Sequence, residues 1–217
     1  WVRNNIEYAP TYGSIQGADQ CLQSKICNDM DTASLLIALL RVSGVYAHYE
    51  YAIIEIPIEK AMNWVGGVTD QKMVGTIFAT NGVPVKMIVS GGTYKSVQIE
   101  HVYASAFIDY LPSRGSVHRQ GDTWIPLDPS FKQYEHKRGL DLYAAMGING
   151  VKYIQDYITD SSTLTLSPEL QAAFPTYMIS PYQYYSKRLF NFVEANMPDA
   201  TYQEVFGADT IEASKTI

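Results

Sequence analysis

The sequence predicts an α+β fold, and three observations lead to this prediction. A strongly apolar stretch with helical spacing runs from Asp29 to Ser43. A run rich in Tyr, Val and Ile follows it from Val45 to Ile56. Two further strand-like runs flank the turn sequence Ser90-Gly91-Gly92-Thr93. A buried helix followed by antiparallel strands, with other helices before and after, is typical of an α+β domain.

The helix predicted at Asp29–Ser43 is apolar nearly all round, so we expect it to be buried rather than amphipathic. Asn28 suits the N-cap position, and Asp31 stands three residues later as a short capping-box partner. Asp29 then lies in the first helical turn, where the peptide dipoles favour a negative charge. Gly44 supplies the C-terminal stop.

The elements after this helix follow from residue type and from turn signals. The run Val45–Ile56 is predicted to be one long strand. Short helices are predicted at Pro57–Val65 and Thr69–Thr80, each ended by a pair that contains glycine. Further strands and helices are predicted at Val83–Val89, Tyr94–Ile108, Trp124–Leu127, Val151–Ile158, Pro168–Phe174 and Pro181–Asn196.

The chain is predicted to have two parts, a core at residues 1–132 and a mostly helical C-terminal extension at residues 133–217 packed on that core. The extension has enough aromatic residues to pack on the core or to cover its cleft, namely Tyr182, Tyr184, Tyr185, Phe190 and Phe192. Because the chain begins with Trp1 rather than Met, we expect it to be part of a larger polypeptide.

Composition excludes several classes of partner. The net charge of −6 is spread along the chain without a basic stripe, which argues against nucleic-acid binding. The longest apolar run, residues 33–40, is too short to span a bilayer. A hydrophobic content of 47% with 18% charged residues is typical of a globular protein with a core. Separately, we expect the protein to bind no cofactor.

Three separated motifs carry a family resemblance. They are Cys27-Asn28-Asp29-Met30-Asp31-Thr32-Ala33, Glu100-His101-Val102-Tyr103 and Trp124-Ile125-Pro126-Leu127-Asp128-Pro129. Their order and spacing resemble the transglutaminase-like superfamily, whose pattern is roughly Gly-x-Cys-x-Asp-x-Ala before a Leu-rich helix, then His-Ala-Trp-x-Glu, then Trp-x-x-x-Asp-Pro. The resemblance covers residues 1–132 and implies a papain-like transglutaminase core in which a buried helix packs on an antiparallel sheet.

Within the family, the chain is most similar to a subgroup that resembles domains of large bacterial Rhs/YD-repeat surface proteins. This subgroup has Gly-Asn-Asp-x-Asp at the helix start, so Asp in place of the catalytic Cys is a feature that it shares. The resemblance implies a bacterial protein at the cell surface, secreted or periplasmic. This chain differs from the subgroup at Cys27, where the subgroup has Gly, and Tyr46 and His48 replace the Pro and Arg of a Gly-Ile-Pro-Ala-Arg turn.

The resemblance also implies the chemistry of the site. In the family a cysteine thiolate attacks an amide carbonyl, a His protonates the leaving amine and an Asp orients the His. Counting back from Ala33 puts Asp29 in the cysteine position, with His101 and Asp128 as its partners. A carboxylate attacks amides poorly, and its acyl product would be an anhydride. We therefore expect a pseudoenzyme without amide-transfer or protease activity, which binds a peptide or protein in its cleft or has a structural role.

Other interpretations of the same residues stay open. Asp29, His101 and Asp128 could form an active hydrolase or acyltransferase site. The three could instead bind a divalent metal, although a further ligand is lacking. Cys27 could be a displaced nucleophile, unless a disulfide to Cys21 removes its thiol. His101 could also lie apart from both carboxylates, because a lone strand His is most often structural.

Tyr12 is a further candidate residue of the site. It lies upstream of the helix, where papain-like folds have an oxyanion-hole donor, and its hydroxyl could take that role.

Overall fold

The computed structural model describes residues 1–110, 120–147 and 181–214. The chain divides into two compact units, Trp1–His136 with Asp209–Ile217, and Lys137–Ala208. The return of the last residues to the first unit was not indicated by the sequence pattern. None of the helices in the described part of the chain combines the length and apolar character needed to cross a membrane.

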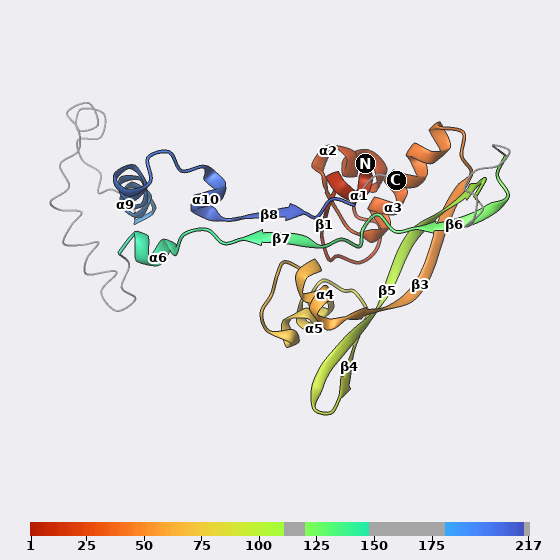
Figure 1. Ribbon diagram of the computed structural model, residues 1–217, viewed down its shortest axis with the longest axis horizontal. Coiled ribbons are helices and arrows are strands. Elements are labelled where there is room, and N and C mark those ends of the chain that lie inside the picture. The colour runs from red at the N-terminus through yellow and green to blue at the C-terminus, as the bar shows by residue number, and fades with distance from the viewer. Residues whose placement is uncertain (111–119, 148–180, 215–217) are drawn as a thin grey trace. The chain divides into compact units, whose positions relative to one another are not determined.

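The first unit is built around a four-stranded sheet with β5 (Thr93–Ile108) at its centre (Figure 1). One side of β5 pairs antiparallel with β3 (Ala47–Pro57) along the whole of β3. The other side is shared between β4 (Val85–Ser90) and β6 (Thr123–Leu127), which pair with its two halves. Helix and antiparallel sheet together make the fold α+β, as predicted.

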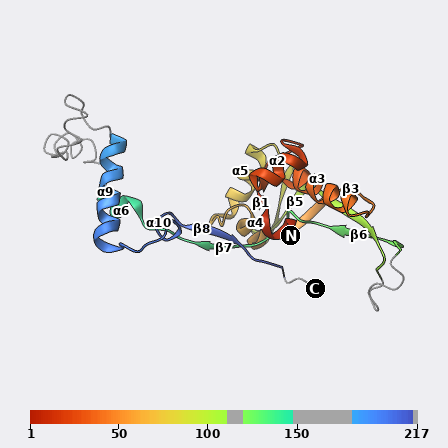
Figure 2. The same cartoon turned by 90° about the horizontal axis from the view of Figure 1, so that it is seen from above.

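Helix α3 (Asp29–Val42) packs on one face of β3 and β5 (Figure 2). Asn28 is the N-cap, because its side chain accepts a hydrogen bond from the backbone N–H of Asp31 at 2.8 Å. A small core joins Ile37 of the helix to Ala47 and Ala104 of the sheet. The helix is therefore held by its apolar face, and its first turn points toward the middle of β5.

The Asp31 carboxylate does not act as the capping-box partner predicted from the sequence. It is fully buried and turns toward the start of α2 (Gly17–Ser24) instead. There it accepts hydrogen bonds from the Ser14 hydroxyl and from three backbone N–H groups, those of Ile15, Gln16 and Gly17, at 2.9–3.2 Å. The first four N–H groups of a helix have no partner within the helix. Asp31 accepts from backbone N–H groups at the start of α2, and these bonds replace the capping box that the sequence predicts within α3.

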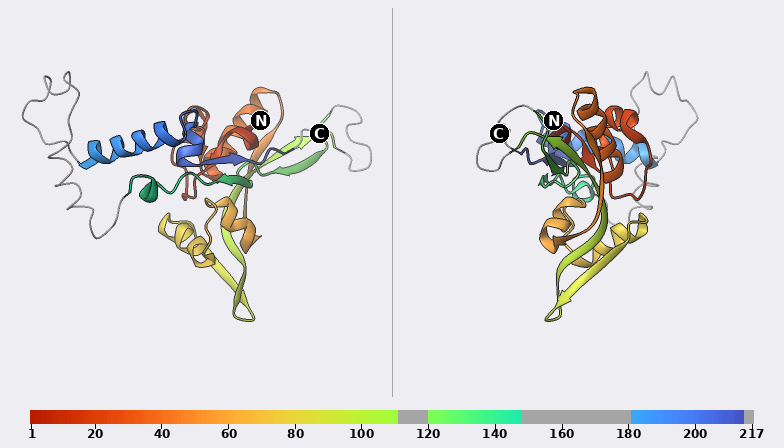
Figure 3. Two further views of the ribbon diagram at one scale, coloured as in Figure 1. Left: turned by 60° about the vertical axis from the view of Figure 1, so that its left-hand side comes forward. Right: turned by 90° about the vertical axis from the view of Figure 1, so that its right-hand side faces the viewer.

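The other face of the sheet is covered by α4 (Ile58–Trp64) and α5 (Gln71–Thr80) (Figure 3). These helices form the largest hydrophobic core of the unit, which includes Trp64 and Phe78 from the helices and Val97 and Ile99 from β5. The hairpin predicted around Gly91-Gly92 is present, because Ser90 and Thr93 close the turn between β4 and β5. Both glycines have the positive φ angles, 60° and 76°, that this tight turn requires.

The N-terminal segment contains α1 (Val2–Asn5) and two short parallel strands, β1 (Glu7–Tyr8) and β2 (Ile26–Cys27). A disulfide joins Cys21 of α2 to Cys27, directly before the N-cap of α3. β7 (Tyr134–Lys137) and β8 (Ala208–Ile211) form a separate two-stranded pair.

In the second unit, the predicted helix Pro181–Asn196 is present as α9. The unit also contains α6 (Leu142–Ala145) and α10 (Tyr202–Phe206), whose N-terminus has a capping box between Thr201 and Glu204. The predicted helices at Val151–Ile158 and Pro168–Phe174 lie outside the described residues.

Candidate functional site

The candidate site lies where one edge of β5 has no strand beside it. β4 pairs with β5 up to Ile99, and β6 pairs with it only from Ala104 onward. In the gap, the backbone N–H of Val102 donates a hydrogen bond to Oδ2 of Asp29 at 2.9 Å. This bond fixes the first turn of α3 beside His101.

His101 lies between two carboxylates. Its Nε2 is 3.0 Å from Oδ2 of Asp128, and its Nδ1 is 3.2 Å from Oδ2 of Asp29. The contact of Nδ1 is an ion-pair contact without a well-aligned hydrogen bond. Burial opposes the charged form, but the hydrogen bond to Asp128 and the negative charges of Asp128 and Asp29 outweigh it and raise the pKa of His101 from 6.5 to about 9. The imidazole is therefore positively charged at neutral pH.

Asp128 is held in place by the turn that follows β6. Its Oδ1 accepts hydrogen bonds from the backbone N–H groups of Ser130 and Phe131 and from the Ser130 hydroxyl, at 2.8–3.1 Å. Burial opposes ionisation, but these bonds and the His101 cation lower the pKa of Asp128. Sequence reasoning missed Ser130, although an Asp side chain in a turn commonly accepts a hydrogen bond from the backbone two residues on.

Trp64 shields the His101 side chain from solvent, and no sequence motif indicated this role. Its ring meets the imidazole edge-on, with ring centres 5.9 Å apart, and its indole N–H donates to the Ser130 carbonyl at 2.9 Å. Tyr8 stacks on the indole with ring centres 4.0 Å apart. Trp64 thus covers one side of the imidazole, whose side chain is only 1% exposed.

A cavity of about 320 Å³ opens on the exposed side of the ion pair. It is lined by Tyr12, Gly13, Ser14, Asp29, Met30, Tyr51, Glu100, His101 and Val102. The Tyr12 hydroxyl donates to Glu100 at 2.7 Å rather than pointing at Asp29, and this bond raises the pKa of Tyr12. Its part in an oxyanion hole stays a prediction.

The geometry argues against a metal bound by Asp29, His101 and Asp128. The two carboxylates bind opposite nitrogens of one imidazole, so the three side chains do not converge on a common point. Among the described residues, no group of three or more His, Cys, Asp or Glu is arranged to hold a metal ion.

Cys27 is not a free thiol in this structure. It is buried, and its sulfur is bonded to that of Cys21. These are the only two cysteines of the chain, so the disulfide-bonded protein has no thiolate to offer.

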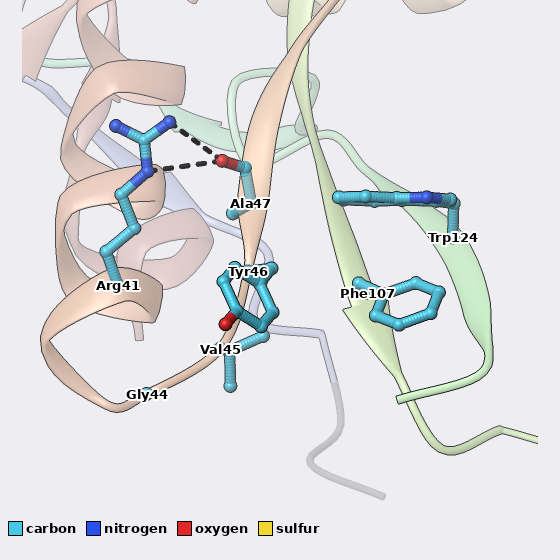
Figure 4. A pocket seen from close by; sticks show the side chains of 7 residues that line it. All are labelled: Arg41, Gly44, Val45, Tyr46, Ala47, Phe107 and Trp124. Atoms are coloured by element: carbon cyan, nitrogen blue, oxygen red, sulfur yellow. Dashed lines mark hydrogen bonds between the residues drawn. The ribbon is translucent and has the colours of Figure 1, made fainter. Parts of the chain in front are cut away.

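A second cavity of about 640 Å³ lies at the start of β3, and none of the predicted site residues lines it (Figure 4). Its lining residues are Arg41, Gly44, Val45, Tyr46, Ala47, Phe107 and Trp124. The Arg41 guanidinium donates two hydrogen bonds to the Ala47 carbonyl, at 2.8 and 3.2 Å (Figure 4).

The charged His101 makes stability dependent on pH. Its folded pKa of about 9 is raised above the ordinary value of 6.5, so its contribution is complete below pH 6.5 and is lost as the pH rises through 9. The difference corresponds to about 3 kcal/mol of unfolding free energy. We expect the stability advantage of wild type over His101→Gln, measured by urea unfolding, to shrink by about this amount between pH 6 and pH 10.

The comparison with His101→Gln is needed because Lys132 acts in the opposite direction. Lys132 is buried, which lowers its pKa from 10.5 to about 8, so the cost of burying its charge disappears as the pH rises. This effect is common to both proteins and cancels in their difference. An advantage that stays constant from pH 6 to pH 10 would mean that folding does not raise the pKa of His101.

Comparisons with known proteins are consistent with this arrangement. A family model described as the transglutaminase-like superfamily matches residues 1–129, which include Asp29, His101 and Asp128. No curated protein and no solved structure matches the chain.

Proposed function

Since the chain belongs to the transglutaminase-like superfamily, we propose that it has kept the cleft of that family without its amide-transfer chemistry. In this proposal Asp29 stands in the position of the nucleophilic cysteine. The domain then acts as a binding or structural module that takes a peptide or protein ligand.

The main support is the bonding of the Asp29 carboxylate. Its Oδ1 accepts a hydrogen bond from the backbone N–H of Met30 at 2.8 Å, and its Oδ2 accepts one from Val102 at 2.9 Å. Oδ2 also faces the His101 cation at 3.2 Å. Attack on an amide would disrupt this bonding and would produce an anhydride. A carboxylate held in this way stabilises the fold of the site rather than reacting.

The cavity beside Asp29 supports a binding role. Its volume of about 320 Å³ lies at the small end of the range for ligand sites and is enough for a side chain of a bound polypeptide. Tyr12 and Tyr51 supply aromatic walls, and Glu100 supplies a fixed carboxylate. A site with apolar walls and few polar groups suits recognition of one side chain.

The disulfide gives support to a proposal about location. Disulfides persist in oxidising compartments and are rare in the reducing cytosol. The Cys21–Cys27 bond therefore favours a secreted, cell-surface or periplasmic domain, and we propose that it is part of a larger polypeptide.

The proposal is tested by assaying purified wild-type protein on a glutamine-containing peptide with an amine acceptor, on an amide substrate and on an activated ester. Asp29→Ala and the double variant Cys21→Ala/Cys27→Ala are assayed beside it. We expect all three proteins to give the same background rate. Wild-type activity lost in Asp29→Ala would instead identify an enzyme that uses Asp29. Activity lost in the double variant, and also in Cys27→Ala but not in Cys21→Ala, would identify Cys27 as the nucleophile.

A further inference from the structure

β3 has one edge that pairs with no other strand in the described part of the chain. The strand is eleven residues long, and its pairing with β5 continues without a bulge from Ala47 to Pro57. Such an edge presents a row of backbone donors and acceptors to solvent. It can therefore accept another strand.

The register shows which backbone groups point outward. Phe107 donates its N–H to the Tyr46 carbonyl at 2.8 Å, so Tyr46 belongs to a hydrogen-bonded pair with β5. Residues of an antiparallel strand alternate between the two sides, so even-numbered residues of β3 bond to β5 and odd-numbered ones face the free edge. Arg41 is consistent with this alternation, because it bonds the outward carbonyl of Ala47. The open part of the edge consists of Tyr49, Tyr51, Ile53 and Glu55.

Only part of this edge is protected in the usual way. Natural sheets guard an edge with charged side chains, Pro or a bulge, and β3 has no bulge, no Lys and no Pro before Pro57, with Glu55 as the one charged residue of its open part. Tyr49, Tyr51 and Ile53 are 48%, 59% and 67% exposed. An exposed strand edge with large apolar side chains can accept an extended chain by strand addition.

The charge next to the edge selects basic residues. Tyr49, Tyr51 and Ile53 share a face with the even-numbered residues of β5, which include Glu100. Glu55 lies on the same face, and Asp29 lies in the cavity wall together with Tyr51. The residues of this face between Tyr49 and Glu55, and their partners on β5, include no Lys or Arg. Lysine side chains would meet carboxylates and tyrosine rings there.

We propose that the free edge of β3 binds an extended peptide strand that places basic side chains on the face of Tyr49 and Tyr51. This inference deepens the proposed binding function, on which it rests, by naming the partner. The peptide backbone pairs with the odd-numbered residues of β3. Its basic residues lie opposite Tyr49, Tyr51 and Ile53 and reach Glu100 and Glu55.

A fluorescein-labelled nine-residue peptide of alternating lysine and valine tests the proposal by fluorescence anisotropy. The proposed pairing is antiparallel, so lysines opposite Tyr49, Tyr51 and Ile53 point their amides to β3, and the valine amides point to solvent. N-methylation of the lysine amides is therefore expected to weaken binding at least tenfold. N-methylation of four valine amides, compared with four methylated lysine amides, gives a peptide of the same charge and size and is expected to change binding less than threefold. Equal binding of both methylated peptides would overturn the proposal.

Variants of the protein give an independent test. Ile53→Pro removes one outward N–H without removing a bond to β5, and proline is tolerated on such edges. We expect it to bind the peptide at least tenfold more weakly than Ile53→Ala, which loses the same side chain and keeps the N–H. Circular dichroism checks that both variants fold. Should Ile53→Pro not fold, the two methylated peptides still decide the question.

Two further outcomes would overturn the inference. One is the absence of peptide binding to the wild type. The other is a wild-type dimer, seen by analytical ultracentrifugation and abolished by Ile53→Lys, which would identify a second copy of the chain as the occupant. Failure of the proposed function is recognised separately, because the activity assays of wild type and Asp29→Ala report it, whereas the two methylated peptides report strand pairing by the wild type alone.

Discussion

Replacing Asp29 by cysteine is expected to create amide-transfer activity at least about 100-fold above the wild-type background. The new thiol would lie at the start of α3, where peptide dipoles favour a thiolate. His101 already lies 3.2 Å from the Asp29 carboxylate, and Asp128 and Ser130 hold its ring from the other side. The substitution therefore places a thiol beside an imidazole that a second carboxylate and a hydroxyl already hold in position.

The measurement is release of ammonia from a glutamine-containing peptide in the presence of an amine acceptor, with the Cys21–Cys27 disulfide left oxidised. Asp29→Ser is the matched control, since it has the same size but a far less acidic nucleophile. Loss of the new activity in Asp29→Cys/His101→Gln would show that the imidazole takes part. If Asp29→Cys is as inactive as Asp29→Ser, the site lacks more than a nucleophile. The proposal that Asp29 stands in the position of a nucleophilic cysteine then loses its chemical support.

The Asp31→Ala substitution is expected to lower the unfolding free energy by about 3 kcal/mol or more. Asp31 is fully buried and accepts four hydrogen bonds, from Ser14, Ile15, Gln16 and Gly17. Removal of the carboxylate leaves the N–H groups of Ile15, Gln16 and Gly17 without the acceptor that a fully buried side chain supplied. The loop that leads to α2 also forms the cavity wall at Ser14.

Urea unfolding of Asp31→Ala and of Asp19→Ala checks this prediction. Asp19 lies in the first turn of α2 and is exposed, so its loss removes a helix-dipole contact worth only about 0.5 kcal/mol. Asp31→Asn keeps the size and part of the bonding and is expected to fall between the two. Equal stability of Asp31→Ala and Asp19→Ala would mean that the four bonds are replaced by water.

The local structure around the candidate site could be predicted from the sequence to a large extent. The helix predicted at Asp29–Ser43 ends one residue earlier, at Val42, and Asn28 is its N-cap as expected. The long strand after it and the glycine hairpin are also present. These features depend on side-chain periodicity, capping and positive φ angles, which are properties of neighbouring residues.

Other features depend on contacts between distant parts of the chain. Asp31 looked like a capping residue, because its bonds to a loop fifteen residues earlier leave no trace in the local sequence. No sequence motif includes Trp64, and its position over His101 follows only from the packing of α4 on the sheet. The free edge of β3 is visible only once the order of the strands is known.

The sequence by itself determined that this chain contains an α+β core with the transglutaminase-like motifs and a carboxylate at the start of the buried helix. Only the tertiary structure decided how that carboxylate is used. The gap between β4 and β6 leaves one N–H of β5 without a strand partner, and Asp29 accepts from it while facing the His101 cation. The type of a residue determines which reactions its side chain could take part in. Its unpaired lone pairs, its charge and its exposure to solvent depend on the groups that the fold places next to it.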